Sequence, residues 1–132
     1  MSEPRNGRYE RDAGDFYWYR DDRLHREDGP AVELKSGVTE WYIDGKRHRI
    51  DGPAVDFGME GGYGEWYQNG LKHREDGPAV FLPLEHAKIE EYWIHGELLT
   101  KKEFLQYCAK KAIREHLQSE LQPKRTTVKL KV

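Results

Sequence analysis

Three nearly identical blocks decide the fold: HREDGPAV at His25–Val32, HRIDGPAV at His48–Val55 and HREDGPAV at His73–Val80. The blocks begin 23 and 25 residues apart. Self-similarity with a period of roughly 20 to 50 residues is typical of repeat proteins, in which each unit packs against its neighbours. The chain is therefore expected to be built from one small structural unit that is used several times.

The tryptophans follow the same period. Trp18, Trp41 and Trp66 each open a Trp-Tyr pair, and a fourth copy has the order Tyr92-Trp93. A turn signal follows every pair, namely Asp21-Asp22, Asp44-Gly45, Asn69-Gly70 and His95-Gly96. Asp-Gly or Asn-Gly between aromatic and β-branched residues is the strongest short-range signal for a β-hairpin. Each unit is therefore predicted to be one hairpin.

The central unit shows how the hairpin should run. Residues 40–43 are predicted to form the incoming strand and residues 46–50 the start of the outgoing strand. Asp51-Gly52-Pro53 then interrupts the ladder, because proline cannot donate a backbone hydrogen bond and glycine tolerates a positive φ. Pairing should resume over residues 54–57, which makes the outgoing strand bulged. The predicted fold class is mainly β, an antiparallel β-hairpin repeat meander.

The chain is predicted to form one structural domain with a helical cap. The repeat region spans residues 1–100, with a degenerate copy at 5–17, repeats at about 16–38, 39–63 and 64–89, and a partial copy at 90–99. A C-terminal helix is expected over 100–122, followed by a basic tail or edge strand at 123–132.

Thr100 and Glu103 have the spacing of a capping box, so the helix should run from Lys101 to about Leu121. An apolar stripe is expected to cover the last hairpins. Its predicted members are Phe104, Leu105, Cys108, Ala109, Ala112, Ile113, His116 and Leu117.

The composition indicates a thin core made of aromatic rings. Of the 132 residues, 36% are hydrophobic, 35% are charged and 12% are aromatic, and 4 of the aromatic residues are Trp. Aliphatic material is too scarce for a thick core, and so many rings are unlike a disordered chain. The lone Cys108 excludes an intramolecular disulfide and suits a reducing compartment. We therefore expect a cytoplasmic protein with no membrane insertion, since the sequence also lacks a long apolar run.

Charge is distributed unevenly behind the net value of −2. Residues 1–100 hold 13 Lys and Arg against 21 Asp and Glu, or −8, whereas residues 101–132 hold 9 against 3, or +6. The basic end is expected to dock on its own acidic body, with contact to a partner as the alternative. Nucleic-acid binding is not expected, because no aromatic residue lies among Lys124, Arg125, Lys129 and Lys131.

The unit W-Y-x-[DN]-G-x-x-H-R-x-D-G-P-A, repeated over about residues 5–98, resembles the divergent MORN-like repeats of bacteriophages and large DNA viruses. Typical MORN units have glycine directly after the histidine, where this chain has Arg26, Arg49 and Arg74. The resemblance implies hairpin sheets that serve as protein-binding, or occasionally lipid-binding, scaffolds without catalysis. It further implies a viral accessory protein that engages a host macromolecule in the host cytoplasm, for instance to inhibit a host defence.

The His-Arg-x-Asp motif admits a structural and a functional interpretation. Histidine and arginine together could serve acid-base or phosphate chemistry. Three regularly spaced copies nevertheless favour a structural role, because catalysis needs one asymmetric constellation. In that role the aspartates accept backbone N–H groups in an Asx-like turn, and the arginines pair with acidic residues or stack on neighbouring rings. Equivalent histidines two strand spacings apart, about 9.5 Å, are also too distant to share a metal ion. No enzyme activity, cofactor or metal is therefore expected.

The expected function is non-enzymatic binding of a protein partner, with a homodimer as a further possibility. The alternative is sequestration of an anionic nucleotide-like ligand through Arg and Tyr of neighbouring repeats. The candidate binding residues are Tyr19, Tyr42, Tyr67, Arg26, Arg49, Arg74, His25, His48 and His73. The candidate structural turn residues are Asp28, Asp51, Asp76, Gly29, Gly52, Gly77, Pro30, Pro53 and Pro78.

Overall fold

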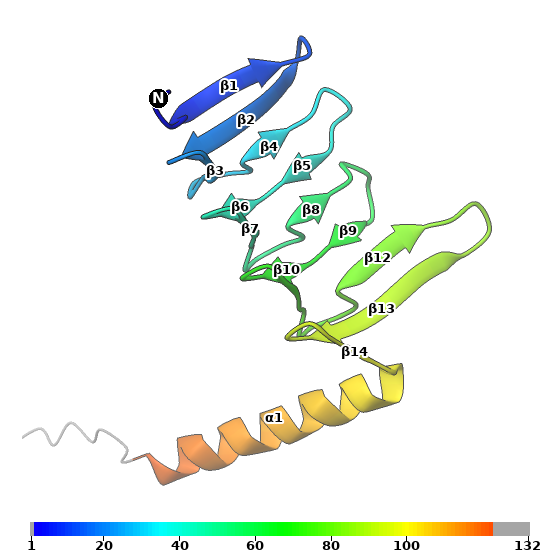
Figure 1. Ribbon diagram of the computed structural model, residues 1–132. Coiled ribbons are helices and arrows are strands. Elements are labelled where there is room, and N and C mark those ends of the chain that lie inside the picture. Colours follow the sequence, from blue (N-terminus) through cyan, green and yellow to red (C-terminus); the bar gives the residue numbers. More distant parts are fainter. Residues whose placement is uncertain (1, 123–132) are drawn as a thin grey trace, which may run out of the picture.

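The computed structural model describes residues 2–122 and shows a stepped antiparallel meander followed by one helix (Figure 1). The predicted basic tail at 123–132 lies outside the described residues. The elements are β1 (Gly7–Arg11), β2 (Asp15–Arg20), β3 (Arg23–Leu24), β4 (Val32–Glu33), β5 (Thr39–Glu40), β6 (Tyr42–Ile43), β7 (Lys46–Arg47), β8 (Val55–Asp56), β9 (Gly64–Glu65), β10 (Tyr67–Gln68), β11 (Leu71–Lys72), β12 (Val80–Pro83), β13 (Lys88–Ile94), β14 (Glu97–Leu99) and α1 (Lys101–Leu121).

Ten strands form one sheet, in the order β1-β2-β4-β5-β8-β9-β12-β13-β14 with β3 paired to β2. Two further pairs, β6-β7 and β10-β11, form small hairpins beside it. All pairings are antiparallel, and neighbours in the sheet follow one another along the chain. The predicted mainly β hairpin meander with a C-terminal helix is confirmed.

The two central hairpins are split at Trp41 and Trp66, whereas Trp18 and Trp93 lie inside the continuous strands β2 and β13. In the central repeat, the Trp41 N–H donates to the Ala54 carbonyl at 2.7 Å, and the His48 N–H donates to the Trp41 carbonyl at 3.0 Å. The predicted strand over 40–43 is therefore two short strands, β5 and β6. The outgoing strand ends at Arg47 and not at residue 50, because the chain leaves the ladder at His48 and returns to it only at Val55.

The hairpin turns have the backbone that their sequences predict. Asp44 and Gly45 have φ of 48° and 79°, the left-handed values that a type I′ turn requires at both central positions. In the first copy Asp21 and Asp22 adopt φ of 50° and 64°, so Asp22 takes the glycine position in the same turn. Aspartate tolerates this region better than most residues because its short polar side chain can bond locally.

The core is thin, and its buried centre repeats with the motif. Ala31, Ala54 and Ala79 are completely buried, and each is followed by a buried valine. In the central repeat, Ala54 and Val55 pack with Tyr67, and the partly buried Val38, Trp41 and Phe57 surround them. The end of each HRxDGPAV block therefore supplies the sheet with its apolar contacts.

Helix α1 begins as predicted, and of the predicted apolar stripe only Phe104 and Cys108 lie on its docked face. The Thr100 Oγ1 accepts from the Glu103 N–H and the Glu103 carboxylate accepts from the Thr100 N–H, which confirms the capping box. Phe104 is buried, and its ring centroid lies 4.7 Å from that of Tyr92.

The prediction of an eight-residue docked stripe is wrong. Leu105, Ala109, Ala112, Ile113, His116 and Leu117 are exposed, whereas Tyr107, Cys108 and Lys111 contact Glu75. Residues three and four apart share one helix face, so Phe104, Tyr107, Cys108 and Lys111 form the docked face. The polar contacts that Glu75 offers fix the rotation of α1, and hydrophobicity alone does not.

Candidate functional site: the His-Arg loops

The segments between the short outgoing strands and the buried alanines form three equivalent loops, here named HR loop 1 (25–30), HR loop 2 (48–53) and HR loop 3 (73–78). In HR loop 2 the guanidinium of Arg49 lies over Trp41, with its central carbon 4.2 Å from the ring centroid. Its Nε donates to Asp51 at 3.3 Å and its Nη1 donates to the Pro53 carbonyl at 3.1 Å. The arginine therefore closes its own loop onto the tryptophan.

The same arrangement occurs in the other two loops. Arg26 lies 4.1 Å from the Trp18 ring, and Arg74 lies 4.0 Å from the Trp66 ring. Both arginines bond the aspartate two residues on and the proline carbonyl four residues on. A guanidinium that stacks on an aromatic ring and uses its planar donors fits such a site better than a lysine ammonium.

Each motif glycine is required because any side chain at its position would collide with the arginine of the same loop. A Cβ atom on Gly52 would lie 2.6 Å from the central guanidinium carbon of Arg49, and the corresponding distances at Gly29 and Gly77 are both 2.9 Å. The tolerance of glycine for a positive φ is not used here, since none of the three lies in the left-handed region. Each arginine is instead held between a tryptophan ring and a glycine that leaves it room.

The motif aspartates also differ from expectation. Turn chemistry predicts that Asp28, Asp51 and Asp76 accept backbone N–H groups in an Asx-like turn. They accept from the arginine Nε atoms of their own loops instead.

The three motif histidines join each repeat to the next one. The Nδ1 atoms of His25, His48 and His73 each accept a backbone N–H from the following hairpin turn, at 2.9 Å in every case. The donors are the N–H groups of Asp44, Asn69 and His95. Because Nδ1 accepts, the ring proton of each neutral histidine lies on Nε2.

At the N-terminal end of the stack a different residue makes the same bond. The Asn6 Oδ1 atom accepts from the Asp21 N–H at 3.0 Å, in the first hairpin turn. Beside it, the Arg5 carbonyl accepts from the Asp22 N–H, as the Leu24 carbonyl does from Gly45 in the next repeat. The chain therefore caps its first repeat with an asparagine in place of a histidine.

His73 is the most deeply buried of the three motif histidines. Its residue is 3% exposed, and its ring stacks on His95 with centroids 4.2 Å apart. Burial, reinforced by the neighbouring His95, lowers the pKa of His73 below its ordinary value of 6.5, against the opposing effect of Glu75. The neutral form, which accepts the inter-repeat bond, is thus the form that the fold favours. Among residues 2–122, no group of side chains is arranged to hold a metal ion.

The tyrosines are less available than expected. Tyr19 and Tyr67 are buried, and the half-buried Tyr42 hydroxyl lies between Glu40 and Arg47. Burial is also the main cause that raises the pKa of Tyr42. Tyr19 is covered by the Arg5 guanidinium at 4.0 Å, and Tyr67 belongs to the apolar cluster. The rings therefore contribute to the thin core, and the candidate tyrosines offer little surface to a ligand.

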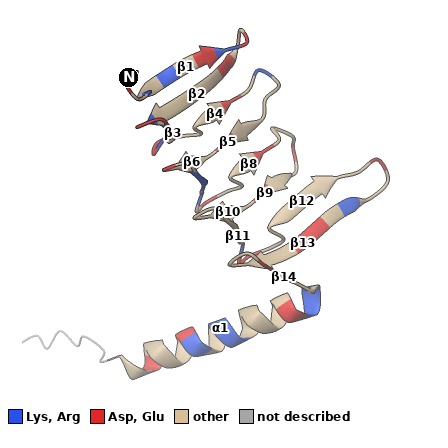
Figure 2. Cartoon of the chain, in the orientation of Figure 1, with Lys and Arg blue, Asp and Glu red and all other residues tan. Residues whose placement is uncertain are grey.

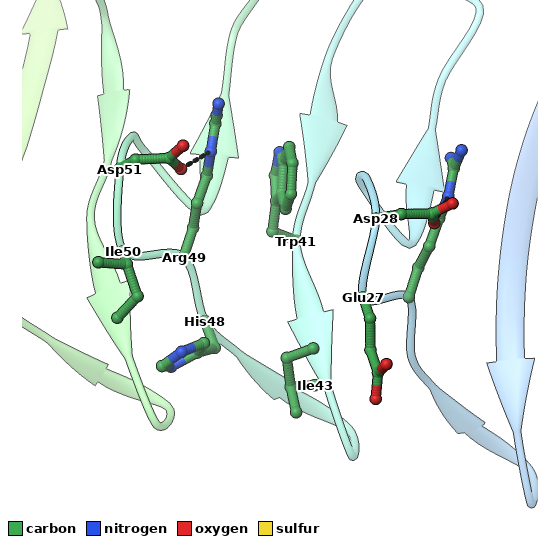
Figure 3. A pocket seen from close by; sticks show the side chains of 9 residues that line it. Glu27, Asp28, Trp41, Ile43, His48, Arg49, Ile50 and Asp51 are labelled. Atoms are coloured by element: carbon green, nitrogen blue, oxygen red, sulfur yellow. Dashed lines mark hydrogen bonds and ion pairs between the residues drawn. The ribbon is translucent and has the colours of Figure 1, made fainter.

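Open grooves lie between successive HR loops. Groove 1, between HR loops 1 and 2, has a volume of about 580 Å³, and groove 2, between HR loops 2 and 3, has about 290 Å³. Figure 3 shows Trp41 standing between the loop that carries Asp28 and the loop that carries Arg49 and Asp51. Groove 1 is lined by Arg26, Glu27, Asp28, Trp41, Ile43, His48, Arg49, Ile50 and Asp51. Groove 2 is lined by Ile50, Asp51, Trp66, Gln68, Arg74, Glu75 and Asp76.

The residues that distinguish one groove from the next were missed from the sequence. Position x of HRxDG is Glu27 in HR loop 1, Ile50 in HR loop 2 and Glu75 in HR loop 3. Ile50 is 66% exposed and borders both grooves. The sequence does contain a signal for them, because x is the one position that varies among the three blocks. A residue that makes none of the contacts within the repeat is free to differ from copy to copy.

Comparison with known protein families, curated proteins and solved structures gives no match to this chain. Within residues 2–122, no helix is both long and apolar enough to cross a membrane.

Proposed function

We propose that this chain is a non-enzymatic repeat scaffold that binds another protein along its row of HR loops. One observation carries the proposal. In three successive copies the histidine, the arginine and the glycine make the same contacts, while Glu27, Ile50 and the intervening grooves face solvent. The motif builds the frame, and the variable positions between its copies supply a surface that can distinguish one partner from another.

The nucleotide-sequestering alternative has less support from the geometry. An anionic ligand would need free guanidinium groups, but Arg26, Arg49 and Arg74 are each engaged by a ring, a carboxylate and a carbonyl. The carboxylates of Asp28, Asp51 and the x-position glutamates line the same grooves and would repel phosphate. A protein surface with apolar and cationic groups is the better complement.

The MORN-like resemblance extends the proposal to a biological setting. Repeats of this kind in bacteriophages and large DNA viruses imply an accessory protein whose partner is a host protein in the host cytoplasm. Inhibition of a host defence is one role that such a complex would serve. The identity of the crosslinked protein, in the experiment described next, tests this part of the proposal.

Photo-crosslinking tests the scaffold function. A photoreactive amino acid replaces Ile50, which borders both grooves, or Met59 in the β8–β9 loop as a control of comparable exposure. We expect one cellular protein to be crosslinked from position 50 and not from position 59. That protein, once purified, should form a complex with the wild-type chain and bind the Ile50→Glu variant more weakly.

Ile50→Glu is a suitable variant because HR loops 1 and 3 already carry glutamate at this position. Its fold should therefore be retained while the shared border of the two grooves changes from apolar to charged. Equal labelling from positions 50 and 59, or a purified candidate that forms no complex, would reject the proposed function.

A further inference from the structure

HR loops 1 and 3 can be compared directly because they share one sequence. Both read HREDGPAV, from His25 and from His73, and both make the same internal bonds. Their x-position glutamates, Glu27 and Glu75, follow the arginine in the same frame. What one loop binds is therefore a guide to what the other can bind.

HR loop 3 binds a lysine. The Lys111 Nζ of helix α1 donates to Glu75 at 2.6 Å, and the Tyr107 hydroxyl donates to the other carboxylate oxygen at 3.0 Å. The Cys108 thiol lies 3.4 Å from the Glu75 carbonyl. The hydrogen bond from Lys111 is the main cause that lowers the pKa of Glu75. The molecule thus shows a helix docked on an HR loop through Tyr, a small apolar residue and Lys.

Among residues 2–122, HR loop 1 presents the same glutamate without such a partner. The Glu27 side chain is 74% exposed, against 37% for Glu75. Its nearest cation is Arg20 at 3.5 Å, which makes its shorter bond, at 2.6 Å, with Asp44, and the His25 Nε2 lies 3.4 Å away. Glu27 is therefore only weakly paired.

Groove 1 adds apolar surface and further negative charge beside Glu27. Trp41, Ile43 and Ile50 line it together with the carboxylates of Asp28 and Asp51. The two arginines in its lining are already held by their own loops. An apolar surface with acidic groups around it complements a segment that carries lysine next to apolar side chains. Figure 2 shows that the chain's own docked segment, α1, carries basic residues along its length.

We propose that groove 1 binds a lysine-bearing amphipathic helix of the partner protein, with the lysine ammonium on Glu27 as Lys111 lies on Glu75 within this chain. This inference rests on the proposed function, because it names the chemistry of the partner that the scaffold binds. The partner helix would place its apolar side chains against Trp41, Ile43 and Ile50.

Fluorescence anisotropy with the full chain tests the inference. The probe is a labelled alanine-based helical peptide with Tyr, Leu and Lys at the spacing of Tyr107, Cys108 and Lys111. A matched peptide has Gln in place of Lys. We expect the lysine peptide to bind about two- to fivefold more tightly, the range of one partly exposed ion pair, and to lose this advantage at high salt.

Two matched variants locate the binding. Glu27→Gln removes the proposed carboxylate at nearly constant volume, and Glu60→Gln removes an exposed carboxylate in the β8–β9 loop. Glu27→Gln should abolish the preference for the lysine peptide and keep the melting temperature, whereas Glu60→Gln should leave binding unchanged. Equal affinity for the two peptides, or a preference that survives Glu27→Gln, would overturn the inference. The scaffold function would stand in that case if crosslinking from position 50 still identified a partner.

Discussion

The HR loops and the C-terminal half of α1 show two ways in which a polar chain can be ordered. In the loops, every arginine contacts a tryptophan ring, an aspartate and a proline carbonyl, and every histidine bonds the next repeat. In the helix, residues 112–121 are all exposed, and its packing against the sheet is confined to the turns before them. The loops are held by tertiary contacts, whereas the end of the helix is held mainly by its own backbone.

This difference explains how a sheet with so little aliphatic core holds together. A cation–π contact contributes about 0.5 to 2 kcal/mol, and a net hydrogen bond contributes about 0.5 to 1.5 kcal/mol. The chain makes this set of contacts in three successive repeats. Because each repeat touches only its neighbours, these contributions accumulate along the stack. Precise polar contacts thus replace part of the stabilisation that a thick core would give.

Crowding the arginine in HR loop 2 should have the largest effect. Gly52→Ala places a Cβ where the Arg49 guanidinium lies, so the side chain must leave its site over Trp41. We expect the free energy of unfolding to fall by about 2 kcal/mol, through loss of the stacking and the two hydrogen bonds. Urea denaturation followed by tryptophan fluorescence measures this loss.

A double-mutant cycle separates this cause from an effect on the backbone. Arg49→Ala alone should be similarly destabilising, and the double variant Arg49→Ala/Gly52→Ala should lose far less than the sum of the two. If the losses add, Gly52 serves its backbone and not its arginine, and the description of the loop given above is wrong.

A smaller effect is expected from protonating the inter-repeat histidine. The pKa of His73 lies below 6.5 in the fold, so the unfolded chain takes up a proton first as the pH falls. The contribution of His73 to stability is therefore complete above pH 6.5 and is lost as the pH falls from there toward the folded-state pKa. The bond from the His95 N–H should account for about 1 kcal/mol of it.

His73→Asn is the matched variant, because Asn6 already makes the equivalent bond at the N-terminal end. Asparagine does not titrate, so the difference in stability between wild type and variant should shrink as the pH is lowered from 7.5 to 5. Denaturation curves across this range provide the measurement. A constant difference would show that the pKa of His73 is the same in the folded and the unfolded chain, which would contradict the prediction.

The sequence predicts the features that depend on neighbouring residues. Asp44-Gly45 adopts its I′ turn and Thr100 with Glu103 forms the capping box, because each is decided within four positions of the chain. The tertiary role of His48 could not be read in the same way, because its donor, Asn69, lies 21 residues away. The role of Gly52 depends on where a long side chain folds back, and local turn rules gave the wrong reason for that glycine.

The helix shows the limit of hydrophobic patterning. Its apolar residues spread around much of its circumference, so periodicity alone allows more than one docked face. The selected face contains Lys111, a residue that a search for apolar stripes rejects, because Glu75 offers it a charged partner on the sheet. The sequence therefore predicts where α1 begins and ends, and the tertiary contact decides which way it turns.

The smallest effect is expected on the free half of this helix. Leu117 is 55% exposed, so Leu117→Ala removes little buried surface and replaces leucine with a better helix former. We expect the free energy of unfolding to change by less than about 0.5 kcal/mol, as for other surface substitutions. Urea denaturation at two protein concentrations, about 1 µM and about 100 µM, measures this change.

A loss as large as that of Gly52→Ala, and larger at the higher concentration, would contradict this prediction. It would mean that a second copy of the chain covers this face, because only association makes stability depend on concentration. The contrast between the packed loops and the free helix half would then hold only for the isolated chain.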